Sequence, residues 1–354
     1  MSTPTVWDAV HHAARDDRRV VFIGSDLNPT LLADMRTELP DQFFMEGIQE
    51  QNVIGMAAGM ALAGARPVVS TIATFLTRRC FEQVLIDVAL HELPVVLLGT
   101  GPGVAYHHFG PTHCAVDDLA LLRTVPGLTL LSPASMAEAA ALTDQAVRGG
   151  IFAYLRVPRY EPAPIAAGLE PPVIGRASRI RDGAHATIVA LGSLTPNALA
   201  AAEALAEEGL SVAVEHVHTV RPLDAALIER VRRSPVVVTV EEHLRDGGLG
   251  TELLHHLSDA DADDAVGADD SDGADDSDGV GGGRAVEAAP RMPRVIRMGL
   301  PTRFVSGYGG WEDAIGAAGL DAEGIAARLR AALRRPVPAG AGAGAGAGAT
   351  EGGR

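Results

Sequence analysis

Two stretches of the sequence gather residue types that can move protons. In the first, Glu50 opens a run of small and apolar residues, 53–64, that is rich in alanine and glycine. Small residues let a neighbouring backbone or helix approach closely, so this run suits a packed interface. A carboxyl group at such an interface is partly removed from water, which favours its neutral form and allows it to share a proton with a ring nitrogen. The alternative is that Glu50 only complements the dipole of the helix that it begins.

The second stretch is a loop between glycines, residues 101–113, which holds Tyr106, His107, His108 and His113. A metal cluster is one interpretation, but no acid or cysteine within the loop completes a ligand set. Histidines in such loops more often serve in acid–base catalysis or hydrogen bonding. The loop therefore predicts proton chemistry in preference to a metal site.

Strands and helices that alternate along the chain must position these two stretches. Loops at the carboxyl ends of parallel strands are where open α/β sheets place their ligands. Alternation of strand and helix predicts parallel sheets, so we predict an α/β protein with two parallel-sheet domains. The predicted strands cover residues 20–24, 66–75, 93–99, 128–133 and 152–159 in the first half and 186–192, 211–217, 235–240 and 294–299 in the second.

The composition along the chain sets the predicted domain boundaries. The first domain is residues 1–160 and the second is residues 186–335, joined by a proline-rich linker at 161–185. Within the second domain, residues 258–290 are aspartate, glycine and alanine of low complexity, which cannot bury enough apolar surface to fold, so we predict a disordered insertion. The glycine–alanine repeat at 336–354 predicts a disordered tail.

The overall composition excludes several classes of protein. The net charge of −16 falls to −6 without the ten aspartates between residues 259 and 278, so nothing resembles a basic nucleic-acid surface. No run of 18 apolar residues predicts a transmembrane helix, and the N-terminus has no signal-peptide pattern. The two cysteines, Cys80 and Cys114, fit a reducing cytoplasm and argue against a disulfide framework or a zinc site.

Three short motifs occur in the first half of the sequence: Asp-Leu-x-Pro at 26–29, Gly-Ile-x-Glu-Gln-Asn at 47–52 and Gly-Pro-Thr-His at 110–113. Together they resemble the pyrimidine-binding domain of the transketolase family of thiamine-diphosphate enzymes. Residues 220–224 and 241–250 resemble the C-terminal domain of the same family. The resemblance corresponds to the C-terminal two-thirds of a transketolase and implies its fold.

The resemblance implies a set of cofactor contacts. Glu50 would hydrogen-bond the aminopyrimidine ring of thiamine diphosphate and favour its imino form, which activates the cofactor. Phe75 would hold the pyrimidine ring, with Phe81 one turn further along, although Phe81 could equally be a core residue. Asp26 would face the cofactor across the interface with another subunit, although propensity alone makes it a turn residue.

The resemblance also implies residues on the substrate side. His113 would line the substrate channel and act in proton transfers, assisted by His107 and His108. Arg156 matches an arginine that binds the substrate phosphate, although it could be a surface residue at a strand end. Arg78, or the next residue, could contact a substrate anion or only cap a helix.

Two departures from the family bear on the substrate. Phe109 stands where common transketolases carry an acid for a hydroxyl group of the donor sugar. Gly101 stands near the position of a phosphate-binding histidine. Both changes argue against the standard sugar-phosphate donor. The Tyr-His-His loop at 106–108 resembles transketolase-like proteins of specialised or nucleotide-sugar pathways.

The sequence contains no Gly-Asp-Gly, the motif that would hold Mg²⁺ and the cofactor's diphosphate. We therefore predict one subunit of a split enzyme, with the cofactor shared with a separate N-terminal, diphosphate-binding subunit in an α2β2 assembly and the Mg²⁺ ligands on that partner. The predicted activity is transfer of a two-carbon ketol unit from a ketose-type donor to an aldehyde. The alternatives are a deoxyxylulose-phosphate-type synthase, a 2-oxo acid dehydrogenase beta subunit, or a non-catalytic scaffold of the same fold.

Overall fold

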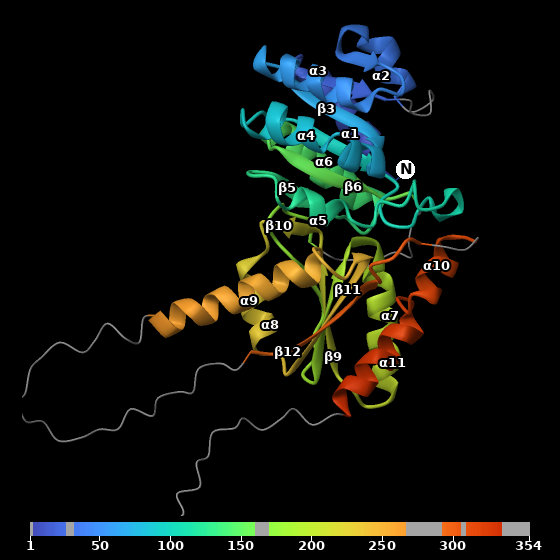
Figure 1. Ribbon diagram of the computed structural model, residues 1–354, viewed down its shortest axis with the longest axis vertical. Coiled ribbons are helices and arrows are strands. Elements are labelled where there is room, and N and C mark those ends of the chain that lie inside the picture. The colour runs from blue at the N-terminus through green and yellow to red at the C-terminus, as the bar shows by residue number, and fades with distance from the viewer. Residues whose placement is uncertain (1–2, 26–31, 160–169, 267–291, 306–308, 335–354) are drawn as a thin grey trace, which may run out of the picture.

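The structure, a computed structural model, describes residues 3–25, 32–159, 170–266, 292–305 and 309–334. These residues form two α/β domains that lie one above the other along the long axis of the molecule (Figure 1). The predicted fold class is thus confirmed. Asp26, the predicted tail and most of the predicted insertion lie outside these residues.

A seven-stranded sheet forms the centre of the first domain. Strands β1 to β6 pair in parallel, as predicted, whereas β10 pairs antiparallel with β5 at the edge. The strands are, in order across the sheet, β10 (Thr219–Arg221), β5 (Thr129–Leu131), β6 (Ala153–Val157), β4 (Val96–Thr100), β3 (Arg66–Ile72), β1 (Val20–Gly24) and β2 (Phe43–Met45).

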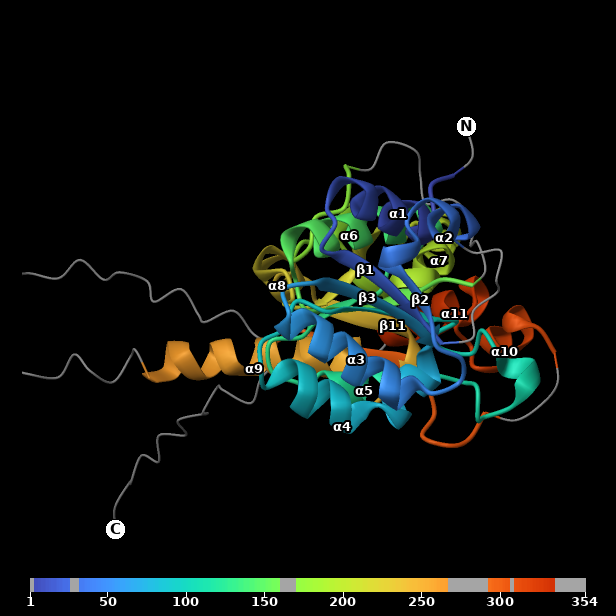
Figure 2. The same ribbon diagram turned by 90° about the horizontal axis from the view of Figure 1, so that it is seen from above.

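Helices cover both faces of this sheet (Figure 2). Neighbouring residues of one strand face opposite ways, so Phe22 joins one apolar cluster and Ile23 the other. One face carries α1 (Val6–Asp16) and α6 (Met136–Gly149), with the short α2 (Ala33–Glu38) close by. The other carries α3 (Glu50–Leu62), α4 (Phe81–Gln83) between the π-helical segments η2 (Phe75–Arg79) and η3 (Val84–Ala89), and α5 (Asp118–Leu122).

The second domain is built on a five-stranded sheet. Its inner strands are parallel, and β7, which lies within the predicted linker, is antiparallel to β9. The order is β12 (Arg294–Leu300), β11 (Val236–Leu244), β8 (Ala186–Leu191), β9 (Val212–Val217) and β7 (Ser178–Arg181). One face carries α7 (Thr195–Glu207), α10 (Trp311–Ala317) and α11 (Ala322–Leu333), and the other carries α8 (Ala225–Arg232) and α9 (Leu249–Val266). Helix α9 extends into residues 258–290, the stretch that was predicted to be disordered.

The two domains are joined by more than the chain connection. Strand β10 belongs to the second half of the sequence but completes the first sheet. One apolar cluster also runs across the junction, from Leu122 and Leu128 in the first domain to Val217 and Leu249 in the second. The loops between the domains therefore sit on a shared, rigid base.

Local capping explains where several helices begin. Ser135 accepts a hydrogen bond from the Glu138 amide at 3.2 Å and caps α6. Thr5 and Asp8 form a capping box at α1. Among the described residues, no helix combines the length and apolar character needed to cross a membrane.

Candidate active site

The carboxyl group of Glu50 is almost completely buried at the start of α3. Its side chain is 3% exposed although it opens the helix, because Val53 and Ala57 bury the inner face of α3 against the sheet. The outer face carries Gly59, where an added Cβ would meet nothing within 4 Å. The sequence analysis predicted an acid that is partly desolvated at a packed interface, and in the structure Glu50 is already buried within its own domain.

Arg79 contacts both Glu50 and Phe75. Its Nη1 donates a hydrogen bond to Glu50 Oε2 at 2.6 Å, and its guanidinium carbon lies 4.4 Å from the centre of the Phe75 ring. The Arg79 side chain is itself 41% exposed. A flat, hydrogen-bonding group is thus stacked on an aromatic ring within reach of a buried carboxylate, and its outer side is open to solvent.

His113 lies on the other side of Phe75. The two rings meet edge to face with 5.2 Å between their centroids, and the Phe109 ring lies 5.2 Å from His113. The Thr112 hydroxyl lies 2.9 Å from His113 Nδ1, which leaves Nε2 for another partner. The structure therefore brings together Glu50, Phe75 and His113, which are separated in the sequence.

The remaining predicted aromatic and histidine residues take different positions. His108 is exposed, and its ring lies tilted against Phe109 near the site, with 4.1 Å between the ring centroids. His107 is buried and turns towards a different hollow, lined by residues of both domains. Phe81 is partly buried against the apolar cluster below the first sheet, in agreement with the core alternative.

Arg78 ties two parts of the site together. It donates to both carboxylate oxygens of Asp117, at 2.7–3.0 Å, and to the Cys114 carbonyl at 3.0 Å. These bonds hold η2 against the segment that follows the histidine loop. Arg79, the neighbour, reaches Glu50 instead.

Arg156 is buried at the junction of the domains. It makes two hydrogen bonds to Asp118, at 2.9 and 3.2 Å, and one to the Glu242 carbonyl at 3.0 Å. Asp118 also accepts a hydrogen bond from the Tyr154 hydroxyl at 2.7 Å. The side chains of Arg156 and Asp118 are 4% and 0% exposed, so this pair is part of the interior.

Glu242 was given no chemistry by the sequence analysis, yet it anchors the histidine loop. Its carboxylate accepts a hydrogen bond from the Val104 amide at 2.7 Å and from the Ser193 hydroxyl at 2.8 Å. An added Cβ on Gly103 would lie 2.2 Å from Glu242 Oε1, so only glycine fits there. Burial raises the pKa of the Glu242 carboxyl. The sequence signal was an acidic pair inside an otherwise apolar strand, 236–244.

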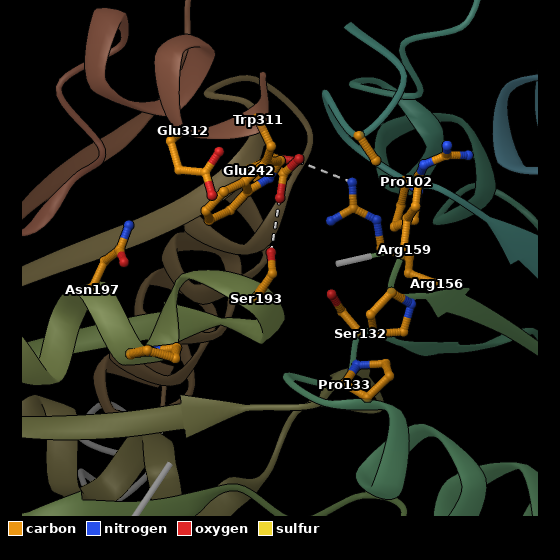
Figure 3. A pocket seen from close by; sticks show the side chains of 13 residues that line it. Pro102, Ser132, Pro133, Arg156, Arg159, Ser193, Asn197, Glu242, Trp311 and Glu312 are labelled. Carbon is orange, nitrogen blue, oxygen red and sulfur yellow. Dashed lines mark hydrogen bonds between the residues drawn. The ribbon is translucent and has the colours of Figure 1, made fainter. Parts of the chain in front are cut away.

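A cavity of about 180 Å³ opens beside Glu242, between the two domains (Figure 3). Figure 3 shows Glu242, Ser193 and Trp311 on the side of the second domain and Ser132, Pro133 and Arg156 on the side of the first.

The two cysteines do not act as nucleophiles. Both are buried free thiols. Burial raises the pKa of Cys80 to about 12 and that of Cys114 to about 11, so neither forms a thiolate near neutral pH. The described residues also contain no group of three acids, histidines or cysteines that could hold a metal ion.

Comparisons with known proteins bear on this geometry. The transketolase pyrimidine-binding domain matches residues 4–162, and the transketolase C-terminal domain matches residues 175–268. One of the subunits of an apulose-4-phosphate transketolase from Phocaeicola vulgatus is 33% identical over 255 residues, which are 71% of this chain and 82% of that relative. The chain belongs to the transketolase family. The resemblance that the three motifs carried is therefore confirmed.

Two further proteins similar to this transketolase-family chain differ in how much of their own length the similarity covers. A 1-deoxy-D-xylulose-5-phosphate synthase of Syntrophotalea carbinolica is 38% identical over 326 residues, which are 90% of this chain and 46% of the synthase. The chain thus spans about half the length of that relative. A solved structure of a split gene transketolase, an inactive beta4 tetramer, matches with a TM-score of 0.75 and 28% identity over 93% of this chain and 96% of that chain.

The family implies thiamine diphosphate as a cofactor, and the residues present fit its pyrimidine end. Arg79 shows that a flat group can stack on Phe75 while hydrogen-bonded to the Glu50 carboxylate. An aminopyrimidine is also flat and offers ring and exocyclic nitrogens at its edge. Glu50 and Phe75 would therefore hold this ring if Arg79 moved aside.

Proposed function

We propose that this chain is the pyrimidine-binding subunit of a two-subunit, thiamine-diphosphate-dependent transketolase. The enzyme would transfer a two-carbon ketol unit from a ketose-type donor to an aldehyde acceptor. The observation that carries the proposal is the buried Glu50 carboxyl beside Phe75 and His113 at one open face of the first domain. The similarity to a subunit of the apulose-4-phosphate transketolase and to a split gene transketolase supports it.

In this proposal the chain's own residues hold and move protons. Thiamine diphosphate supplies, when bound, the carbon nucleophile that accepts the two-carbon unit. Glu50 shares a proton with a pyrimidine nitrogen, and its burial strengthens that hydrogen bond. Phe75 holds the ring by stacking. His113, fixed at Nδ1 by Thr112, exchanges protons with substrate hydroxyl groups through Nε2.

The other predicted substrate residues act around this centre. We propose that His108 and Phe109, both exposed, border the substrate. Arg78, which precedes the histidine loop in the sequence, bonds to Asp117, and Arg156, which follows the loop, bonds to Asp118. Both arginines thus hold the segment just after the loop, so they act as positioning residues. We also propose that Asp26 faces the cofactor from a neighbouring subunit.

A partner subunit would complete the site. Four large apolar side chains are exposed on α3 and on the segments 48–49 and 84–90 that precede it or pack beside it: Ile48 is 70% exposed, Leu62 65%, Ile86 43% and Leu90 68%. Apolar side chains gathered in this way are typical of a protein interface. We propose that the diphosphate-binding subunit covers them in an α2β2 assembly and supplies the Mg²⁺ ligands. The free thiols support a reducing, cytoplasmic location.

The test is an assay of the reconstituted enzyme. The chain is combined with a candidate partner that carries Gly-Asp-Gly, and ketol transfer is measured with thiamine diphosphate and Mg²⁺. Glu50→Gln should lower kcat at least about 100-fold because the amide cannot exchange the proton. Glu203→Gln, on the exposed side of α7, is the matched control and should leave the rate unchanged. Full activity in Glu50→Gln would refute the proposal.

A second candidate function is synthesis of a 1-deoxy sugar phosphate from a 2-oxo acid and an aldehyde. The observation that favours it is the 38% identity to a 1-deoxy-D-xylulose-5-phosphate synthase over 90% of this chain. The two functions share Glu50 and differ in the donor. Carbon dioxide released from pyruvate, with no turnover of ketose donors, would select the synthase.

A further inference from the structure

A hollow beside the histidine loop, lined by residues of both domains, has no role in the proposed reaction. Its volume is about 480 Å³. The first domain contributes Val104 and His107, and the second contributes residues of the β12 end, the following loop and α10. It shares no lining residue with the cavity of Figure 3.

The side chain of His107 lines this hollow and makes no hydrogen bond to any described residue. It is 5% exposed, and neither ring nitrogen has a partner within the part of the chain that the structure describes. A buried polar group without a partner is costly and rare, so such a group points to a missing ligand. Neutral imidazole offers one donor and one acceptor to a molecule in the hollow.

Two arginines border the same hollow. Arg245 and Arg303 are exposed, and neither side chain has a hydrogen bond or ion pair to any described residue. The nearby Asp313 is already engaged, because its Oδ2 accepts the Gly310 amide at 2.8 Å and caps α10. Two guanidinium groups are thus available in a chain whose net charge is −16.

The rest of the lining is apolar and includes Leu300, Pro301, Val305, Ala314 and Ala317. An apolar hollow of a few hundred Å³ with a few convergent polar groups is typical of a small-molecule site. Guanidinium groups match the oxygens of a phosphate in a bidentate manner, and an imidazole N–H can donate to a further oxygen.

We propose that this hollow binds a phosphate-bearing small molecule, with Arg245 and Arg303 on the phosphate and His107 on a polar group of the remainder. The site does not depend on the proposed ketol transfer. It is nevertheless connected to the candidate active site by a series of turns. Within these turns the Gly110 amide donates to the His107 carbonyl at 2.9 Å and the His113 amide donates to the Gly110 carbonyl at 3.1 Å.

The test is calorimetric titration of the full chain with D-ribose 5-phosphate, inorganic phosphate and D-ribose as separate probes. We expect ribose 5-phosphate and inorganic phosphate to bind saturably, and ribose not to bind. Tighter binding of the ester than of inorganic phosphate would assign the site to a phosphorylated metabolite, and equal binding would assign it to free phosphate. The double variant Arg245→Ala/Arg303→Ala should weaken binding about tenfold or more. Arg328→Ala, an exposed arginine on α11, is the matched control.

A variant of His107 separates binding from folding. His107→Leu removes a buried group that lacks a partner, so it should raise the Tm of the free chain while weakening binding of ribose 5-phosphate severalfold. A purely structural histidine would instead give a lower Tm. Glu50→Gln should bind the probe like the parent chain, so loss of the proposed catalysis would not affect this result. Absence of saturable binding, or unchanged affinity in the arginine double variant, would overturn the proposal.

Discussion

Two carboxylate–guanidinium pairs in the first domain have similar chemistry and very different surroundings. In the pair of Asp118 and Arg156, the side chains are 0% and 4% exposed, and Tyr154 and two backbone carbonyls complete the hydrogen bonding. In the pair of Glu50 and Arg79, the acid is 3% exposed but the arginine is 41% exposed. The Arg79 guanidinium also lies over the Phe75 ring, 4.4 Å from its centre.

This difference separates a structural pair from an exchangeable one. Breaking the buried pair would leave a charge without a partner in the interior, which costs several kcal/mol. Arg79 can leave its acid and be solvated, because one side of its guanidinium already meets water. A ligand can therefore replace Arg79 at Glu50, whereas no ligand can replace Arg156 at Asp118 without unfolding the junction.

The largest expected effect is on the buried pair. Arg156→Ala should lower the free energy of unfolding by about 3–5 kcal/mol, because Asp118 stays buried without its counter-charge. Urea unfolding followed by circular dichroism measures this change. A loss of under about 1 kcal/mol, as expected for an exposed pair, would show that the two pairs do not differ.

A smaller effect is expected for the hydroxyl group that completes the buried pair. Tyr154→Phe removes one buried hydrogen bond to Asp118 while the ring packing is kept. The expected loss is about 1.5–3 kcal/mol, the range for a hydrogen bond to a charged group. Phe152→Leu, close by in sequence but with no hydroxyl group, controls for packing. An unchanged urea midpoint in Tyr154→Phe would indicate that Arg156 alone stabilises Asp118.

A buried carboxyl group, that of Glu241, should make the stability of the folded chain depend on pH. Burial raises the pKa of the Glu241 carboxyl from 4.5 to about 8, although its oxygens accept the Leu249 and Gly250 amides. Between these values the folded chain keeps a proton that the unfolded chain has lost, so stability falls as the pH rises from about 5 to 8. Glu241→Gln removes this titration and should flatten the curve of unfolding free energy against pH. Equal slopes for Glu241→Gln and the parent chain would contradict this assignment, and Glu82→Gln, on the surface, is the control.

The smallest stability effect is expected at the open pair, together with a gain in binding. Arg79→Ala should lower the free energy of unfolding by about 1 kcal/mol, the low end of the cost of an unsatisfied buried acceptor, because the gap left by a side chain that is 41% exposed lets water reach the Glu50 carboxylate. If Arg79 competes with the pyrimidine for Glu50 and Phe75, this variant should bind a free aminopyrimidine more tightly than the parent chain. Calorimetry with thiamine measures this directly. Weaker binding would mean that Arg79 assists the ring instead of giving way to it.

The sequence predicted those parts of the fold that depend on local pattern. The position of Glu50 at the start of its helix follows from the neighbouring residues. The parallel strands follow from their apolar runs. Strand β10 was not predicted, because three residues carry no sign of which sheet they will join.

The sequence predicted residues of the candidate site, but it did not predict which of their side chains contact one another. Phe75 and His113 meet because parallel strands bring their carboxyl ends together. Arg78 and Arg79 both follow Phe75 within η2, and the sequence does not indicate which of them reaches Glu50; in the structure it is Arg79. Arg156 pairs with Asp118, 38 positions away in the sequence, and Glu242 bonds to Val104, 138 positions away. A single sequence does not predict which residues contact one another over such separations.

The addition of β10 to the first sheet has a consequence for any attempt to dissect the chain. A fragment ending at residue 159 would lack this strand, and the amide and carbonyl groups along the outer side of β5 would be uncovered. A bare edge of this kind recruits strands from other molecules, so such a fragment is expected to form aggregates. The chain therefore works as an indivisible unit, and the pyrimidine-binding part is not a module that can be transplanted alone.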